Sequence, residues 1–236
     1  MEFTHKFLLN EQKCERKTIA ALKGILSFND ELLNFYFNFY KKLSNFDENV
    51  SLQDLSIILI HIKMIKTYYC LSDLLKKGHY CEFQSLQRDV FELAYLSEYL
   101  IKNPDMVDPW FCGEQINHSH VANNLDIPNG IRKLYGMMCD YTHPNIKGAR
   151  GNLILGQSDF IGFQETPEFH KSTAYALMAI QITFMYGAIE LFYNHFKKFG
   201  VFDQDTEKQM KLKLNKKISY WIKFSEKSED KIFPIQ

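Results

Sequence analysis

Several features of well-known protein classes are missing from this chain of 236 residues. Neither charge is in excess, because 28 lysines and arginines balance 28 aspartates and glutamates, so no overall field attracts nucleic acid. The five cysteines are scattered without C-x-x-C spacing, which argues against a zinc site or a redox pair. Walker A, dinucleotide-binding, G-x-S-x-G and H-E-x-x-H motifs are also absent. We therefore expect no cofactor and no metal.

The sequence also gives little indication of a targeting or membrane-spanning segment. Residues 1–17 are interrupted by charges and lack the apolar stretch of a signal peptide, so we expect a cytoplasmic protein with reduced, mostly buried thiols. Ser172–Ile189 carries no charge, but polar residues interrupt it and Lys171 and Glu190 flank it. We interpret it as a buried core helix and expect no membrane association. Abundant Tyr, Phe, Asn and Lys fit an AT-rich bacterial genome.

Helical periodicity dominates the rest of the chain and predicts an all-α fold. We expect a single helical bundle of about six or seven helices, with at most one small β-hairpin near residues 152–163. The long central helices are expected at 51–78, 81–102 and 167–199. Within one domain, 1–236, we distinguish N-terminal helices (1–50), a core (51–200) and a C-terminal helix with a tail (201–236).

Local signals refine the first half of this bundle. Residues 10–44 are predicted to form two helices that break near 27–30, where Asn29 and Asp30 could cap the second. Ser51 followed by Asp54 resembles a capping box, and Gly78 marks the end of the helix that it opens. His61 lies within the apolar pattern of that helix and is interpreted as a hydrogen-bonded core histidine.

The helix at 81–102 carries an unusual charged pair. Arg88 and Glu92 are one helical turn apart and lie among aromatic residues, Phe91 and Tyr95, rather than among other surface charges. If that face is packed, a guanidinium and a carboxylate there need partners, because an unpaired buried charge is costly. A structural ion pair is the simpler interpretation, and a ligand-binding or catalytic pair is the alternative.

A second polar group surrounds the histidine in the stretch MCDYTHPNIKG. Pro144 forces His143 out of helical geometry, so the imidazole lies where the helical pattern of 131–141 stops. His143 there either interacts with the negative end of the helix dipole or contributes to a binding pocket beside the glycine-rich segment. Its polar neighbours in that pocket would be Asp140, Tyr141 and Asn145.

The other histidine pair, His118 and His120, forms an H-x-H in a turn-rich region. A metal site needs at least a third ligand, and the spacing offers none. We interpret both as solvent-exposed loop histidines.

Two short motifs carry a resemblance to a known family. R-D-V-F-E lies on a helix that ends at N-P-D, and a short helix ending in Y-x-H-P follows after an irregular stretch. This arrangement, over roughly residues 50–200, resembles uncharacterised bacterial all-helical domains related to the HEPN superfamily. By that resemblance Arg88 and Glu92 match the helix motif, and His143 with Pro144 matches the histidine motif.

The resemblance implies a function. Many HEPN proteins are dimeric, metal-independent ribonucleases of toxin–antitoxin and antiphage systems, with an arginine and a histidine four to six residues apart. Here Arg132 precedes His143 by eleven residues, or ~16 Å along a helix, so the pairing must cross helices, with Arg88 as its donor. Arg88 and His143 would then be catalytic, within ~8 Å of each other, and act on RNA. The binding or supporting residues would be Glu92, Tyr95, Asp140, Tyr141 and Asn145.

The resemblance also implies a homodimer and a protein partner encoded nearby. The alternative is a non-catalytic binding or immunity-type module, in which the same Arg, Glu and His residues hold the helices in register. The sequence leaves both hypotheses open.

Overall fold

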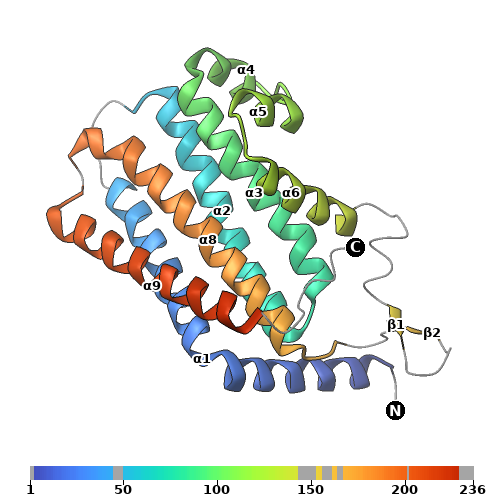
Figure 1. Cartoon of the computed structure of the whole chain (residues 1–236). Helices are drawn as coiled ribbons and strands as arrows, with labels where there is room; N and C mark the ends of the chain where they lie inside the picture. Colours follow the sequence, from blue (N-terminus) through green and yellow to red (C-terminus); the bar gives the residue numbers. More distant parts are fainter. Residues whose placement is uncertain are drawn as a thin grey trace.

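The fold is an all-α bundle (Figure 1), seen in a computed structural model that describes residues 3–44, 50–142, 153–155, 161–163, 167–200 and 202–228. Eight α-helices lie in these residues, more than the six or seven expected, because the turn-rich region 103–128 holds two short ones. The α-helices are α1 (Phe3–Ser44), α2 (Leu52–Lys77), α3 (Tyr80–Lys102), α4 (Val107–Phe111), α5 (His118–Asn124), α6 (Asn129–Thr142), α8 (Lys171–Phe196) and α9 (Gln204–Ser228).

Helix α1 consists of two helical arms joined across a kink, as the two predicted helices imply, but the predicted position of the break near residues 27–30 is wrong. The bend lies at Leu22, whose backbone leaves helical geometry at φ −119° and ψ 16°. The first arm of α1 crosses the base of the bundle, and the second enters it beside α2 and α8 (Figure 1). The first arm is held by Glu11, whose carboxylate accepts a hydrogen bond from His79 Nε2 at 2.6 Å.

The ends of α2 follow the local signals in the sequence. Ser51 and Asp54 form the predicted capping box, and Gly78 ends the helix in the left-handed conformation with φ 86°. A Cβ atom at Gly78 would lie 3.0 Å from the Glu168 carbonyl oxygen and 3.2 Å from Cys14 Sγ. The turn between α2 and α3 therefore requires glycine both for its φ and for the close approach of two other segments.

Helix α8 contacts α1, α2, α3 and α9 and forms part of the hydrophobic core, as expected of the uncharged stretch. Two segments are long and apolar enough to cross a membrane: α2, and α8 together with the turn that follows it. In the second segment, Lys171–Phe199, 61% of the most apolar 18-residue window is buried inside the fold. Such burial is typical of the core helix of a bundle. Gln181 of α8 donates hydrogen bonds to Asn29 and Ser72, which joins α8 to α1 and α2 within the core.

The remaining elements are a pair of short strands, two 3₁₀ turns and the helices at the side of α3. Strands β1 (Leu153–Leu155) and β2 (Ile161–Phe163) pair antiparallel, with Leu153 opposite Phe163. Two 3₁₀ turns, Pro104–Met106 and Lys197–Phe199, follow α3 and α8. Helix α6 packs against α3, and α5 packs against α3 as well, so the middle of α3 is covered by both.

Candidate functional site

The predicted pair of Arg88 and Glu92 is present on α3. Arg88 Nε lies 3.6 Å from Glu92 Oε1, and Arg88 Nη2 donates a hydrogen bond to Asp89 Oδ1 at 3.3 Å. Burial lowers the pKa of Arg88, but the two carboxylates raise it further, so the guanidinium stays charged. Arg88 Nε is closed off from solvent, and no described residue accepts a hydrogen bond from it. The guanidinium is therefore fixed in place with donor capacity to spare.

Glu92 is fixed in turn by α6. Tyr135 Oη donates a hydrogen bond to Glu92 Oε1 at 2.6 Å. Burial and the neighbouring Glu92 raise the pKa of Tyr135 well above its ordinary value, so the phenol remains a proton donor at neutral pH. A chain of contacts thus runs from α6 through the carboxylate to the guanidinium of Arg88.

His118 belongs to this cluster, and the prediction that it is a solvent-exposed loop histidine is wrong. It is the first residue of α5, it is half-buried, and its ring stacks on Tyr135 with centroids 4.1 Å apart. Phe91 lies against both rings, 5.8 Å from His118 and 5.2 Å from Tyr135. Burial and Arg88 lower the pKa of His118 while Glu92 raises it; the net shift is downward, so the imidazole is neutral at pH 7.

The structure places only some of the other residues predicted for this site. Tyr95 packs its ring on Phe91 at 4.5 Å, so it supports the aromatic wall and not the charged atoms. Asp140 is half-buried near the end of α6. Tyr141 lies in α6, but its side chain is outside the described residues, as are His143 and Asn145. The distance from Arg88 to His143 therefore stays a prediction.

A groove borders the cluster on the side of α2. It has a volume of about 1010 Å³ and lies between α2, α3 and residues 110–118. Glu92 and His118 are part of its lining. The groove thus shares two side chains with the cluster around Arg88.

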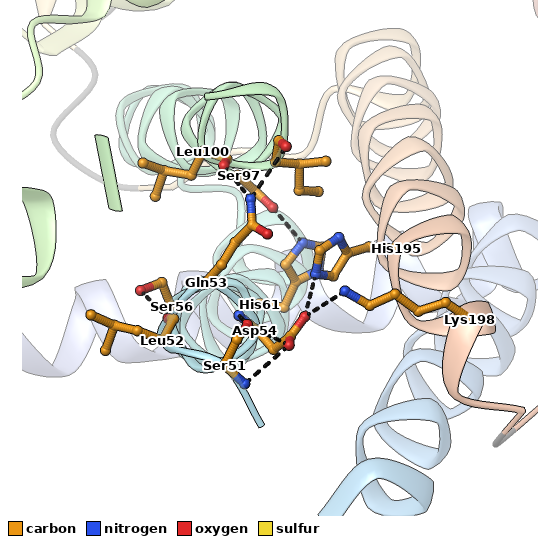
Figure 2. A network of polar contacts seen from close by, with 11 residues as sticks. Ser51, Leu52, Gln53, Asp54, Ser56, His61, Ser97, Leu100, His195 and Lys198 are labelled. Atoms are coloured by element: carbon orange, nitrogen blue, oxygen red, sulfur yellow. Dashed lines mark hydrogen bonds and ion pairs between the residues drawn. The ribbon is translucent and has the colours of Figure 1, made fainter. Parts of the chain in front are cut away.

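A second polar cluster lies deeper in the bundle (Figure 2). Asp54 accepts hydrogen bonds from His195 Nε2 at 2.8 Å and from Lys198 Nζ at 3.0 Å. Nearby, His61 is hydrogen-bonded to Tyr36 and, at 2.9 Å, to Ser97. These contacts link α1, α2, α3 and the end of α8.

This second cluster is structural. His61 is fully buried, as the sequence predicted, and burial lowers its pKa to about 3, so the ring is neutral and confined between its partners. The side chains of Asp54 and His195 are almost completely shielded from solvent. Lys198 reaches the surface, but Asp54, His195 and His61 are shielded from a substrate, so we assign the cluster to holding the bundle together.

One cysteine takes part in the first cluster, because Cys139 is hydrogen-bonded to Tyr135 and also raises its pKa. All five cysteines are free, but only Cys14 is buried, whereas Cys70 and Cys112 are exposed, so the prediction of mostly buried thiols is wrong. Within the described ranges, no three His, Cys, Asp or Glu side chains come together as a metal site would require. His120, the partner of His118 in the H-x-H, is hydrogen-bonded through Nε2 to Tyr99 Oη at 3.0 Å.

Comparison with known proteins gives no family assignment. No protein-family model, no curated protein and no solved structure matches the chain.

Proposed function

We propose that the chain is a metal-independent endoribonuclease of the HEPN type, which cleaves RNA at a site built around Arg88. The observation that carries the proposal is the guanidinium of Arg88, held by Glu92 and Asp89 through contacts of 3.6 Å and 3.3 Å. Nε is closed off from solvent and Nη2 donates to Asp89, so the donors that a phosphate could use are the remaining N–H groups on the two Nη atoms. Arginine is well suited to this role because its planar fork matches two phosphate oxygens.

The reaction that fits such a site uses the 2′-hydroxyl of the RNA itself. The 2′-oxygen attacks the adjacent phosphorus as it loses its proton, the bond to the 5′-oxygen breaks, and that oxygen takes up a proton. The products are a 2′,3′-cyclic phosphate and a 5′-hydroxyl. Arg88 would stabilise the charge that develops on the phosphate oxygens. His143, matched by the resemblance, would take or give the proton.

His118 gives the proposal a sharp internal test. Its neutral imidazole lies beside Glu92 and Arg88, so it could also act as a base. If His143 is the catalytic histidine, His143→Ala abolishes cleavage, while His118→Ala lowers it only by loosening Tyr135. If only His118→Ala abolishes cleavage, the role that the resemblance gives to His143 is wrong.

The experiment is an RNA cleavage assay in the presence of EDTA, with the 3′ ends of the products identified. We expect the wild type to cleave, Arg88→Ala to lose at least 100-fold in rate, on the order of one oxyanion-stabilising contact, and Arg88→Lys to recover little. Arg16→Ala, at an exposed position on α1, is the matched control and keeps full activity. Circular dichroism of each variant verifies that the fold is intact.

A folded wild-type chain that leaves RNA intact would overturn the proposal, and so would an Arg88→Ala variant of unchanged activity. In either case the alternative, a non-catalytic binding or immunity module, would account for the cluster as a structural ion pair. Toxicity of the wild type on expression, relieved by His143→Ala, would instead support the proposal in the cell.

The same resemblance leads us to propose a bacterial, cytoplasmic homodimer that works with a protein partner encoded nearby in a defence or toxin system. A strictly monomeric mass across micromolar concentrations would count against the dimer.

A further inference from the structure

The groove between α2, α3 and residues 110–118 has a mixed lining. Its wall on α2 and α3 is mostly apolar, through Leu59, Ile60, Leu93 and Leu96. The segment 110–118 contributes the ring of Trp110 and several side chains that can form hydrogen bonds, namely Glu114, Gln115, Asn117 and His118. With a volume of about 1010 Å³, the groove is as large as a small-molecule site. A lining of this kind suits a ligand with flat apolar faces and a polar edge.

The turn after α4 fixes Trp110 and Glu114 relative to each other. Glu114 N donates a hydrogen bond to Pro109 O at 2.9 Å, and Gly113 N donates one to Trp110 O at 3.0 Å. Gly113 has a φ of 97°, which residues with a side chain rarely adopt, so glycine lets the chain fold back here. Trp110 is half-buried, whereas Glu114 is exposed and forms no ion pair with any described residue. The backbone of this turn thus holds one aromatic ring and one carboxylate at the groove.

Lys63 brings a cation to the opposite wall. It is exposed on α2 and lines both the groove and a smaller pocket of about 280 Å³ that reaches Asp89. Within the part of the chain that the structure describes, its ammonium forms no ion pair, so it is available to a phosphate. Asp89 and Glu92, by contrast, are already in contact with Arg88. The groove therefore offers a cation close to the residues that hold the guanidinium.

We propose that this groove binds one unpaired nucleotide of an RNA chain, with its base against Trp110 and its phosphate on Lys63. Single-stranded RNA is commonly recognised by aromatic side chains on which a splayed base stacks. The inference rests on the proposed function, because Glu92 and His118 belong both to the groove lining and to the cluster around Arg88. A nucleotide in the groove would therefore be close to the phosphate that Arg88 holds.

Glu114 gives the groove a preference among bases. A carboxylate accepts a hydrogen bond from the exocyclic amino group of cytosine, whereas uracil has a carbonyl oxygen at the same position. The amides beside it discriminate less. Asn117 Oδ1 already accepts from Ser119 N at 2.9 Å, and Gln115 can donate or accept. We therefore expect cytosine to be bound more tightly than uracil.

Two other ligands fit less well. Double-stranded RNA keeps its bases stacked and paired, so none of them can reach Trp110. A wholly apolar ligand would cover the Glu114 carboxylate and the neighbouring amides without pairing them, which is costly.

The test measures the binding of RNA that cannot be cleaved. Fluorescein-labelled hexamers of cytidine or uridine carry 2′-O-methyl groups throughout, so no 2′-hydroxyl can attack, and fluorescence anisotropy follows their binding to the full chain. We expect saturable binding, with the cytidine hexamer bound at least about fivefold more tightly than the uridine hexamer. Free CMP should compete at least about tenfold less well than the cytidine hexamer, because it lacks the neighbouring phosphates.

The variants separate the contributions of ring and cation. Trp110→Ala should weaken the binding of both hexamers at least about tenfold, as expected when a stacked base loses its ring, and Trp110→Phe should retain most of it. Phe111→Ala, at the neighbouring exposed ring outside the lining, is the matched control and should change nothing. Lys63→Ala should weaken both hexamers alike, and Lys66→Ala, also exposed on α2, is its control.

Glu114→Gln tests the preference for cytosine. The amide can donate to the carbonyl oxygen of uracil as well as accept from cytosine, so the difference between the hexamers should disappear. Lys63 and Glu114 are exposed, so their variants keep the fold and test the inference even where Trp110→Ala does not.

Four results would overturn the inference. They are no saturable binding of either hexamer, equal binding of both by the wild type, equal loss in Trp110→Ala and Phe111→Ala, and competition by CMP as strong as by the cytidine hexamer. The last of these would show a site for a free nucleotide.

Binding of uncleavable RNA is measured independently of cleavage, so the two proposals fail separately. A chain that binds the hexamers as expected but leaves ordinary RNA intact has the nucleotide site without the ribonuclease activity. A chain that cleaves RNA, but binds the hexamers equally well in the wild type and Trp110→Ala, has the activity without this site.

Discussion

Asp54, in the first turn of α2, accepts a hydrogen bond at 2.8 Å from His195 in the last turn of α8. Lys198 reaches the same carboxylate oxygen at 3.0 Å, and Ser51 is hydrogen-bonded to the other oxygen (Figure 2). An acidic group at a helix N-terminus and basic groups at a helix C-terminus each interact favourably with the helix dipole. One buried carboxylate therefore joins the ends of two central helices.

Replacing Asp54 by Asn should destabilise the bundle markedly. The change keeps the shape but removes the negative charge that faces Lys198 and accepts the hydrogen bond of His195, so we expect a loss of about 2 kcal/mol in the free energy of unfolding, within the range for charged hydrogen bonds. Asp203→Asn is the matched control, because Asp203 caps α9 through Thr206 in the same way but is exposed. Urea denaturation that gives equal losses for both variants would contradict the structural role of burial at Asp54.

The stability of the fold should fall as the pH drops below about 6.5. His61 has a pKa of about 3 in the folded chain, against an ordinary 6.5, so the unfolded chain binds a proton between these values while the folded chain does not. Stability is then complete above pH 6.5 and is lost progressively below it, by at most about 1.4 kcal/mol per pH unit from this group.

The measurement is the free energy of unfolding from pH 7.5 to about pH 5.5, which stays above the range in which most carboxylates protonate. His61→Asn should lower the overall stability but flatten its dependence on pH, because the group that titrates is gone. His170→Asn, at a half-exposed histidine, should leave the dependence as it is in the wild type. An unchanged slope in His61→Asn would show that other groups, such as His195, dominate the titration.

Both ends of α2 were predictable from local signals, whereas α8 begins at Lys171 and not at the expected residue 167. The capping box at Ser51 and the glycine at Gly78 fix α2 to within one residue of the expected 51–78, because both signals act within a few residues of chain. Asn29 misled the prediction for α1. It resembles a helix cap, but its side chain donates to Ser72 Oγ at 3.0 Å inside the core, so the helix continues through it.

Only the part of the candidate site that lies on one helix could be predicted from the sequence. Arg88 and Glu92 are four residues apart, and helical spacing alone brings them together. Tyr135 and His118 join them through packing between α3, α5 and α6, over separations for which no periodic pattern exists. An aromatic residue or histidine on a short helix gives no sign of which neighbour it will contact until the helices are placed.

Gly78→Ala should cost more stability than the same change at another left-handed glycine. Both Gly78 and Gly200 have positive φ values, 86° and 67°, so alanine is strained at either position by about 1 kcal/mol. At Gly78 the new Cβ also meets the Glu168 carbonyl oxygen at 3.0 Å, whereas nothing lies within 4 Å at Gly200. The difference in midpoint between the two variants in thermal unfolding measures the close approach alone, and equal midpoints would contradict it.

Tyr135→Phe tests whether the hydrogen bond to Glu92 holds Arg88 in position. The variant keeps the ring that stacks on His118 but removes the hydroxyl that donates to Glu92 at 2.6 Å, so we expect a loss of about 1 kcal/mol in the free energy of unfolding. If the proposed ribonuclease activity is present, its rate should fall by less than in Arg88→Ala, because the guanidinium is still there but less well fixed. Tyr69→Phe, at a largely exposed tyrosine of α2, is the control for both measurements. Unchanged stability in Tyr135→Phe would mean that Glu92 finds another partner, and a rate as low as that of Arg88→Ala would mean that the phenol itself takes part in the reaction.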